Sequence, residues 1–215
     1  VLLEAATSQE RLALSVEADG GSLAAVLVTE SLDGETPAGT DVITPGAAPA
    51  TDLVVPGVEI VEPASQGEVP DATTGADSSD SPAVRIVNPG DQAATVSLSM
   101  LGPEGETQLA GASGVVVDPG AVFDISLAGV GPGAYGVHVT SDRAVGAAVR
   151  LVRSGGEYPA RSGALAPDVG WIQAQDSQAT VSGALTLPAG GMTSALAISN
   201  SGAAAASIVI AAADG

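Results

Sequence analysis

Glycine and proline interrupt this chain so often that little room is left for long helices. Its 215 residues include 28 glycines and 14 prolines, spread along the whole length. Both residue types disfavour helix interiors and favour turns. Between the turns, apolar and polar residues alternate with a period of two, which is typical of strands that bury one face. The sequence therefore predicts an all-β protein.

The central part of the chain has the clearest strand pattern. Strands are predicted at residues 83–87, 95–101, 114–117, 123–127, 136–140 and 145–152, and turn residues separate them at 89–90, 103–105, 119–120 and 131–133. Short strands at regular spacing favour an antiparallel β-sandwich. The alternation predicts that Val84, Ile86, Val96 and Leu98 point into the core, whereas Arg85 and Ser97 point outward.

One stretch of the sequence occurs twice. VRIVNPGDQAATVSL at residues 84–98 and LAISNSGAAAASIVI at residues 196–210 are identical at five of fifteen positions, at an offset of 112. In both copies an Asn-x-Gly turn joins two alternating stretches. We expect the glycine to supply a positive φ and the asparagine amide to bond the nearby backbone. Residues 194–200 and 207–211 are accordingly predicted to be strands.

A second match runs between the start and the middle of the chain. VEADGGSLAAVLV at residues 16–28 resembles VTSDRAVGAAVRL at residues 139–151, and GETPA at 34–38 then resembles GEYPA at 156–160, an offset of about 122. Together the two matches indicate a repeat of about 110 to 120 residues, which is a common size for a β-sandwich.

The repeat predicts two immunoglobulin-like antiparallel β-sandwich units. The first is split between residues 1–62 and residues 191–215, and the second covers residues 83–190. The strands at 194–200 and 207–211 are expected to pack with N-terminal strands at 12–16 and 23–29. Residues 63–82 contain almost no large apolar side chains and are rich in Asp, Ser, Thr, Gly and Pro. Such a segment buries little surface, so it is predicted to be an exposed linker.

Charge and composition exclude several functions. The chain has no lysine, and six arginines against 25 carboxylates give a formal net charge of −19. This charge repels phosphate backbones and anionic headgroups, so neither nucleic acid nor membrane contact within this segment is expected. There is no cysteine, so disulfides and thiolate metal sites are excluded. No apolar run is long enough for a membrane helix, and any signal peptide or anchor would lie outside the segment.

No motif commits the chain to a reaction, so no catalytic residue and no cofactor is predicted. GPGAYG at residues 131–136 fits the dinucleotide pattern G-x-G-x-x-G, but it leads into a predicted strand instead of a helix and is interpreted as a turn. His138 is the single histidine, and no serine lies in a recognisable nucleophile elbow. An Asp/Glu pair of a glycoside hydrolase stays open, because any two of the 25 carboxylates can meet in the fold.

Three weaker signals each have a structural and a functional interpretation. Asp77 to Asp80 (DSSD) with Asp71 can gather Ca²⁺ but lack the spacing of a dedicated loop, so a solvated linker is preferred. Trp171 with Tyr158 can form a platform for sugars, although a core position for the tryptophan is preferred. Four arginines lie close in sequence and are expected to neutralise nearby carboxylates, with an anionic-polymer site as the alternative: Arg143, Arg150, Arg153 and Arg161.

The order of motifs from VNPGD at 87–91 through VVVDPG at 115–120 to VTSDRAVGAAVRLV at 139–152, with Trp171 afterwards, resembles an uncharacterised family of large secreted proteins of actinobacteria. The resemblance implies an acidic, extracellular or cell-surface β-sandwich protein of the cell envelope. We therefore expect a non-catalytic module, not an enzyme, with a scaffold or adhesion role and a cell-envelope polysaccharide or protein as partner. The alternative is a carbohydrate-binding module for a cell-wall polysaccharide, and a hydrolase with an Asp/Glu pair is a more distant one.

Overall fold

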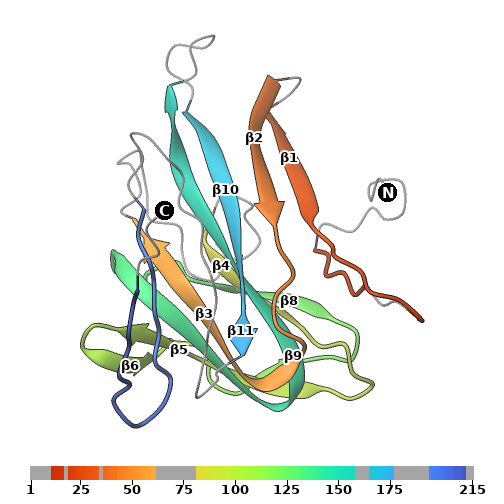
Figure 1. Cartoon of the computed structure of the whole chain (residues 1–215), viewed down its shortest axis with the longest axis vertical. Helices are drawn as coiled ribbons and strands as arrows, with labels where there is room; N and C mark the ends of the chain where they lie inside the picture. Colours follow the sequence, from red (N-terminus) through yellow and green to blue (C-terminus); the bar gives the residue numbers. More distant parts are fainter. Residues whose placement is uncertain are drawn as a thin grey trace.

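The computed structural model describes residues 11–16, 19–33, 36–61, 81–157, 165–176 and 194–211. In these ranges the protein is all-β, without a helix, and every strand pair is antiparallel. No helix that could cross a membrane therefore occurs in the described part of the chain. Its strands, shown in Figure 1, are β1 Leu27–Asp33, β2 Thr36–Ile43, β3 Ala50–Ile60, β4 Ala83–Val87, β5 Ala94–Gly102, β6 Gly105–Gln108, β7 Val115–Val117, β8 Val122–Ser126, β9 Gly133–Glu157, β10 Leu165–Gln173 and β11 Gln175–Asp176.

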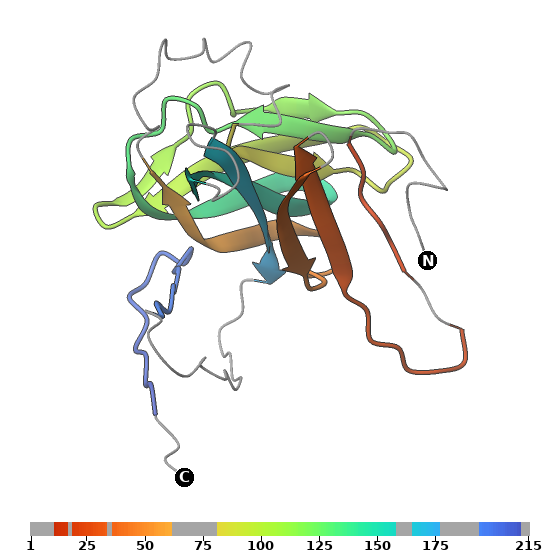
Figure 2. The same ribbon diagram turned by 90° about the horizontal axis from the view of Figure 1, so that it is seen from above.

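Most of these strands form one sandwich of two sheets that share the long strand β9. In sheet I, the first half of β9 lies between β3 and β5; β11 continues beside β3, and β6 and β7 pair with β5. In sheet II, the second half of β9 lies between β4 and β10, and β8 is next to β4. Figure 2 shows the layers from above. Because β9 pairs in both sheets, it joins the two layers covalently.

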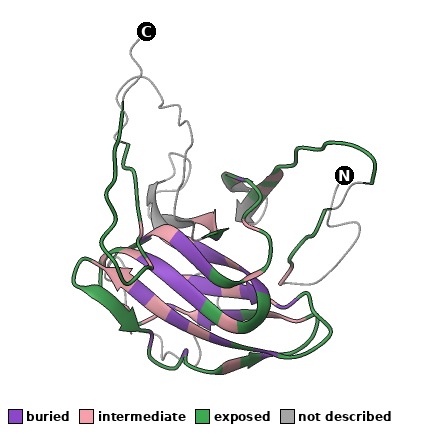
Figure 3. Cartoon of the chain, turned by 60° about the horizontal axis from the view of Figure 1, so that its bottom comes forward, coloured by how far each residue is buried: buried purple, intermediate pink, exposed green. Residues whose placement is uncertain are grey.

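The core lies between the sheets and is aliphatic. Val84, Ile86, Val96 and Leu98 are fully buried, as their alternation predicted, while Arg85 and Ser97 are only partly buried on the opposite faces. Buried residues alternate with less buried ones along the central strands (Figure 3). Burial of one such aliphatic side chain contributes about 1.5–3 kcal/mol, so many small contributions hold this aromatic-poor core together.

The predicted strands agree closely with the structure in the central region, except at one turn and at β6, which was not predicted. β4 has the predicted bounds, β5 and β8 differ by one residue at each end, and β7 begins one residue later than predicted. The expected break between residues 140 and 145 is wrong, because β9 runs through it without interruption. Asp142 explains the difference: its Oδ1 accepts a hydrogen bond of 2.7 Å from the Thr95 N–H at the start of β5. The carboxylate thus caps a neighbouring strand instead of turning its own.

β3 connects the N-terminal part of the chain to the central sandwich. It pairs with β9 from Ala50 opposite Val145 to Ile60 opposite Gly133, and its side chains Leu53, Val55 and Val58 are fully buried in the core. The expected boundary between residues 1–62 and residues 83–190 therefore does not coincide with a boundary in the sheet. Two complete immunoglobulin-like units are not seen: the described residues form one sandwich and the separate β1–β2 hairpin.

The β1–β2 hairpin has the same pairing as the β9–β10 hairpin. Leu27 lies opposite Ile43 and Val28 opposite Val42. At the positions that the repeat makes equivalent to Leu27 and Val28, Arg150 lies opposite Trp171 and Leu151 opposite Gly170. In both places, the residues directly after an Ala-Ala-Val sequence pair with the next strand of the chain. The hairpin is thus a second copy of part of the central unit.

The two Asn-x-Gly turns also have the same geometry. The Asn88 side chain accepts a bond of 3.0 Å from the Gly90 N–H and donates one of 2.8 Å to the Gln92 carbonyl. Asn200 accepts from Gly202 at 3.0 Å and donates to Ala204 at 2.8 Å. The expected positive φ is wrong, since neither glycine is among those with φ above zero. Instead, a Cβ at Gly90 or Gly202 would lie 3.2 Å from the asparagine Oδ1.

The Asn88 turn is an arch between the two sheets and not a hairpin. β4 pairs with β8 and β9 in sheet II, whereas β5 pairs with β6, β7 and β9 in sheet I. The two arms of the arch therefore face each other across the core without sharing backbone hydrogen bonds. The equivalent segment, residues 194–211, is called the C-terminal arch below.

The C-terminal arch differs from the prediction in two ways. It contains no strand, although residues 194–200 and 207–211 were predicted to be strands. It also lies beside the central sandwich: a Cβ at Gly57 of β3 would meet Ala197, and one at Gly136 of β9 would meet Ser199. The expected packing with the N-terminal strands is not seen, because residues 11–16 and 19–26 lie on the opposite side in both views (Figures 1 and 2). Of the predicted linker at residues 63–82, residues 63–80 fall outside the described residues.

Candidate functional site

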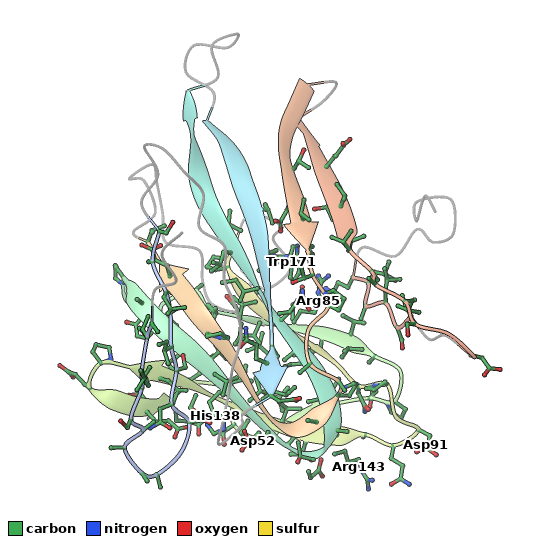
Figure 4. All side chains as sticks on the ribbon, in the orientation of Figure 1. Asp52, Arg85, Asp91, His138, Arg143 and Trp171 are labelled. Carbon is green, nitrogen blue, oxygen red and sulfur yellow. The ribbon has the colours of Figure 1, made fainter. Side chains whose placement is uncertain are left out.

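A group of charged and aromatic side chains lies on the outer face of sheet II. Each of four neighbouring strands contributes one side chain to it: Asp124 from β8, Arg85 from β4, Arg150 from β9 and Trp171 from β10. We call these residues, together with Arg11, the arginine cluster. The alternation that sends Val84 and Ile86 into the core places Arg85 on this face. Figure 4 shows Arg85 next to Trp171.

Asp124 is the centre of the arginine cluster. It is only 5% exposed. The Arg85 guanidinium donates two hydrogen bonds to it, from Nε to Oδ1 at 2.8 Å and from Nη2 to Oδ2 at 2.9 Å. Arg150 Nη1 and Arg11 Nε each lie 3.8 Å from Oδ2. A two-pronged arginine–carboxylate pair is strong and directional, so it fixes β4 against β8.

The other members tie this face to chain segments outside the sheet. Arg150 is buried and donates two bonds, of 3.1 and 2.9 Å, to the Ser81 carbonyl just before β4. The Arg85 guanidinium lies 4.7 Å from the centre of the Trp171 ring. The backbone N–H of Trp171 donates a hydrogen bond of 2.9 Å to Asp41 Oδ2 of β2. These contacts therefore join sheet II to β2 and to the residues just before β4.

A second polar group surrounds His138 on the outer face of sheet I, and we call it the histidine cluster. His138 Nδ1 lies 2.8 Å from Glu106 Oε1 of β6, and Nε2 lies 3.4 Å from Asp52 Oδ1 of β3. Ser99 of β5 donates a short hydrogen bond to Glu106. His138 is buried, and among the described residues its Nε2 has no hydrogen-bond partner. Figure 4 shows His138 and Asp52 side by side.

The histidine cluster is ordered differently from a catalytic triad. In a triad the histidine lies between the serine and the carboxylate and removes the serine proton. Here the Ser99 hydroxyl and His138 Nδ1 both bond to Glu106 Oε1, so the serine proton is directed to the carboxylate and not to the imidazole. The hydrogen bond from Ser99, followed by the one to His138, lowers the pKa of Glu106. A general acid requires a raised carboxyl pKa, the opposite direction.

The predicted site residues are dispersed. Of the four arginines that are close in sequence, Arg150 joins the arginine cluster, Arg143 is exposed at the bend of β9, and nothing is described for the side chains of Arg153 and Arg161. Tyr158 and the acidic stretch around Asp77 to Asp80 also lie outside the described residues. A core position was preferred for Trp171, and this prediction is wrong. Trp171 stacks on Arg85 at the outer face of sheet II.

Two other predictions concern motifs. The GPGAYG stretch leads into β9 and not into a helix, and the Tyr135 hydroxyl closes it by donating to the Gly131 carbonyl at 3.1 Å. Among the described residues, no three His, Cys, Asp or Glu side chains come close enough together to hold a metal ion.

Sequence reasoning missed Arg85 and Asp124 as partners. They are 39 residues apart in sequence and become direct neighbours only through the pairing of β4 with β8. One signal was present: Asp124 is a charged residue inside an otherwise apolar strand, VFDIS. A charge at such a position usually has an oppositely charged partner in the fold.

Comparison with known proteins gives a family but no activity. No curated protein matches the chain. The crystal structure of Thermotoga maritima 1070 aligns with 61% of this chain and 96% of its own, at 16% sequence identity and a TM-score of 0.38. The family model "Family of unknown function (DUF5719)" matches residues 1–215. The chain therefore belongs to the DUF5719 family along its whole length.

Proposed function

We propose that this chain is a non-catalytic β-sandwich scaffold of the extracytoplasmic bacterial cell envelope. The observation that carries the proposal is the engagement of Asp124 by Arg85. A buried charge held by two protein bonds serves the fold, because its bonding capacity is directed to the neighbouring strand. The lowered pKa of Glu106 points the same way, since an ionised, hydrogen-bonded carboxylate does not act as a proton donor near neutral pH.

The connection of the chain's parts supports a scaffold role in particular. β3 precedes residues 62–80 yet completes sheet I of the unit that follows them. A strand shared in this way resists separation of adjacent units, because pulling them apart breaks a whole ladder of hydrogen bonds and exposes Leu53, Val55 and Val58. The acidic surface adds solubility and keeps the protein away from anionic polymers.

The experiment has two parts. The first is fractionation of cells that produce the protein, followed by detection with an antibody against this segment. We expect the protein in the envelope or secreted fraction, and a cytoplasmic signal would contradict the proposed location. The second part is titration of the purified chain with soluble fragments of cell-wall polysaccharide, with tryptophan fluorescence as the readout. Trp171 is the single tryptophan, so any change reports on the arginine cluster.

A carbohydrate-binding module is the alternative, and the position of Trp171 outside the core favours testing it. A scaffold predicts no saturable fluorescence change, whereas a sugar that stacks on the indole ring predicts one. Trp171→Phe keeps an aromatic ring and serves as the control for binding measured by calorimetry. The more distant alternative, a hydrolase, predicts the release of new reducing ends that is lost in the Asp52→Asn/Glu106→Gln double variant.

A further inference from the structure

The C-terminal arch exposes side chains whose repeat equivalents form the core. Leu196, Ile198, Ile208 and Ile210 are 54%, 50%, 54% and 72% exposed. Their equivalents at an offset of 112 are Val84, Ile86, Val96 and Leu98, all 0% exposed. The four positions keep their apolar type and their alternation, but in the C-terminal arch their side chains are half or more exposed. Exposed apolar patches of this kind mark interaction surfaces.

The geometry of the first arch explains why the second one contains no strand. The arms of an arch belong to different sheets, so they cannot bond to each other, and each needs a neighbouring strand. One strand serves both arms in the central unit: β9 pairs with β4 from Gly146 to Arg150 and with β5 from Gly136 to Ser141. The C-terminal arch thus needs a strand with the sequence pattern of β9.

The chain contains a second copy of that pattern, at residues 16–28. The segment of residues 11–16 and 19–28 is called the N-terminal segment. Its side chains Leu14, Val16, Leu23 and Val26 are exposed, although Val139 and Val149, the equivalents of Val16 and Val26, are buried. The segment runs into the β1–β2 hairpin as β9 runs into its pairing with β10. Among the described residues, no strand pairs with residues 12–16 or 22–26 as β4 and β5 pair with β9 in the central unit.

Within one molecule these two surfaces lie apart. In both views the C-terminal arch is on the left and the N-terminal segment on the right, and the central sandwich lies between them (Figures 1 and 2). We propose that the C-terminal arch of one copy pairs with the N-terminal segment of a second copy, head to tail. The contact is between two different surfaces, so repeated association produces open chains of molecules. This inference rests on the strand patterns and does not depend on the proposed function.

The repeat also gives the register of the contact. In the central unit Val84 lies opposite Val149, Arg85 opposite Ala148, and Leu98 opposite Val139. The same pairing places Leu196 opposite Val26, Ala197 opposite Ala25, and Ile210 opposite Val16 of the second copy. A shift by one residue would turn every apolar side chain to the wrong face, so this register is strongly selected.

Charge adds a condition on the assembly. Each copy carries a formal net charge of −19, so two copies repel each other at low ionic strength. Added salt screens this repulsion, and the apolar contact itself is not weakened by moderate salt. Association is therefore expected to strengthen from low to moderate salt, the opposite of a contact that is held by ion pairs.

The test uses the absence of native cysteine. Ala197→Cys and Ala25→Cys are prepared as separate variants, so that a disulfide between them in a mixture is intermolecular. The control pair is Ala205→Cys with Ala25→Cys; Ala205 is an exposed alanine of the same arch, and its equivalent, Ala93, lies outside the pairing with β9. Both pairs are oxidised mildly at increasing protein concentration and in two salt concentrations.

We expect the mixed disulfide of the 197/25 pair to form at least about tenfold faster than that of the 205/25 pair, because pairing raises the local thiol concentration. Leu196→Asp in the Ala197→Cys variant should remove this advantage. Equal rates for the two pairs would overturn the proposal. So would an Ala25→Cys/Ala197→Cys double variant that forms its disulfide only within one molecule, since the ends would then close on each other. Neither result would bear on the cell-fractionation test of the proposed function.

Discussion

Asn88 and Asn200 are 112 residues apart, and their side chains make the same two turn hydrogen bonds, with equal distances. Their surroundings differ. Asn88 is buried, and its amide also donates to the Val117 carbonyl at 3.0 Å, which ties the arch to β7. Asn200 is exposed. The sequence of the turn therefore determines its local shape, whereas the packing around the turn depends on the rest of the fold.

Asn88→Ala should destabilise the protein strongly, whereas Asn200→Ala should not. The first change removes two donated bonds and one accepted bond at a buried position and leaves the Val117 carbonyl without this donor, at a cost of about 2–3 kcal/mol. The second change affects exposed groups and should cost less than about 0.5 kcal/mol in dilute solution. Denaturation with urea measures both values. Equal effects would show that the Asn88 turn is not part of the packed core.

Leu53→Ala tests whether β3 belongs to the central sandwich. Leu53 is fully buried against strands that follow it by 80 or more residues, so its truncation should cost about 2–5 kcal/mol. Leu196→Ala is the matched control, because Leu196 is exposed and should leave the stability of the single molecule nearly unchanged. A loss below about 1 kcal/mol for Leu53→Ala would contradict the position of β3 in the core.

Asp124→Asn tests the role of the arginine cluster in the fold. The change leaves Arg85 without its counter-charge in a mostly buried position and should cost about 3 kcal/mol. Asp91→Asn, at an exposed carboxylate, should change stability by less than about 0.5 kcal/mol. The double variant Arg85→Leu/Asp124→Leu should be more stable than Asp124→Asn, because it removes both charges together. A double variant that is less stable would show that the ion pair contributes more than its desolvation costs.

The histidine cluster predicts a specific loss of stability in acid. The pKa of Glu106 is lowered in the folded protein, chiefly by the hydrogen bond from Ser99 and then by the bond to His138. A carboxyl group with a lowered folded pKa contributes stability that is present above its unfolded pKa and is lost as the pH falls through the folded pKa. Glu106→Gln should therefore flatten the decline of the unfolding free energy below about pH 4.5.

The control for this prediction is Glu104→Gln, at an exposed residue of the turn before β6. Its stability should fall with pH as in the unaltered protein. If Glu106→Gln and the unaltered protein lose stability in parallel between pH 5 and pH 3, the bond from Ser99 to Glu106 does not stabilise the fold.

The sequence predicted the strands of the central unit well, because the alternation from Val84 to Leu98 is a local property of strands that bury one face. It did not predict their partners. Pro56 and Gly57 interrupt the alternation in β3, where Gly57 has φ +72° and the pairing with β9 shifts between Val55 and Val58. Such a bulge hides a core strand from pattern analysis.

The candidate site depended even more on long-range pairing. Arg150 was singled out as one of four arginines that are close in sequence. The arginine that donates two hydrogen bonds to Asp124 is Arg85. Only the register of β4 against β8 brings Arg85 and Asp124 together. Likewise, alternation shows which side chains of an arch are buried but not which sheet each arm joins. The segment expected to be a hairpin at residues 194–211 is therefore an arch whose arms pair with no strand among the described residues.

Amide hydrogen exchange at low and high protein concentration tests the central claim most directly. We predict that amides of residues 196–198 and 208–210 exchange almost freely in dilute solution and become protected at high concentration, together with those of residues 16–26. Amides of β4 and β5 should be protected at both concentrations, because β9 already pairs with them. Protection of residues 196–198 in dilute solution equal to that of β4 would contradict the account, and so would an arch that stays unprotected at every concentration.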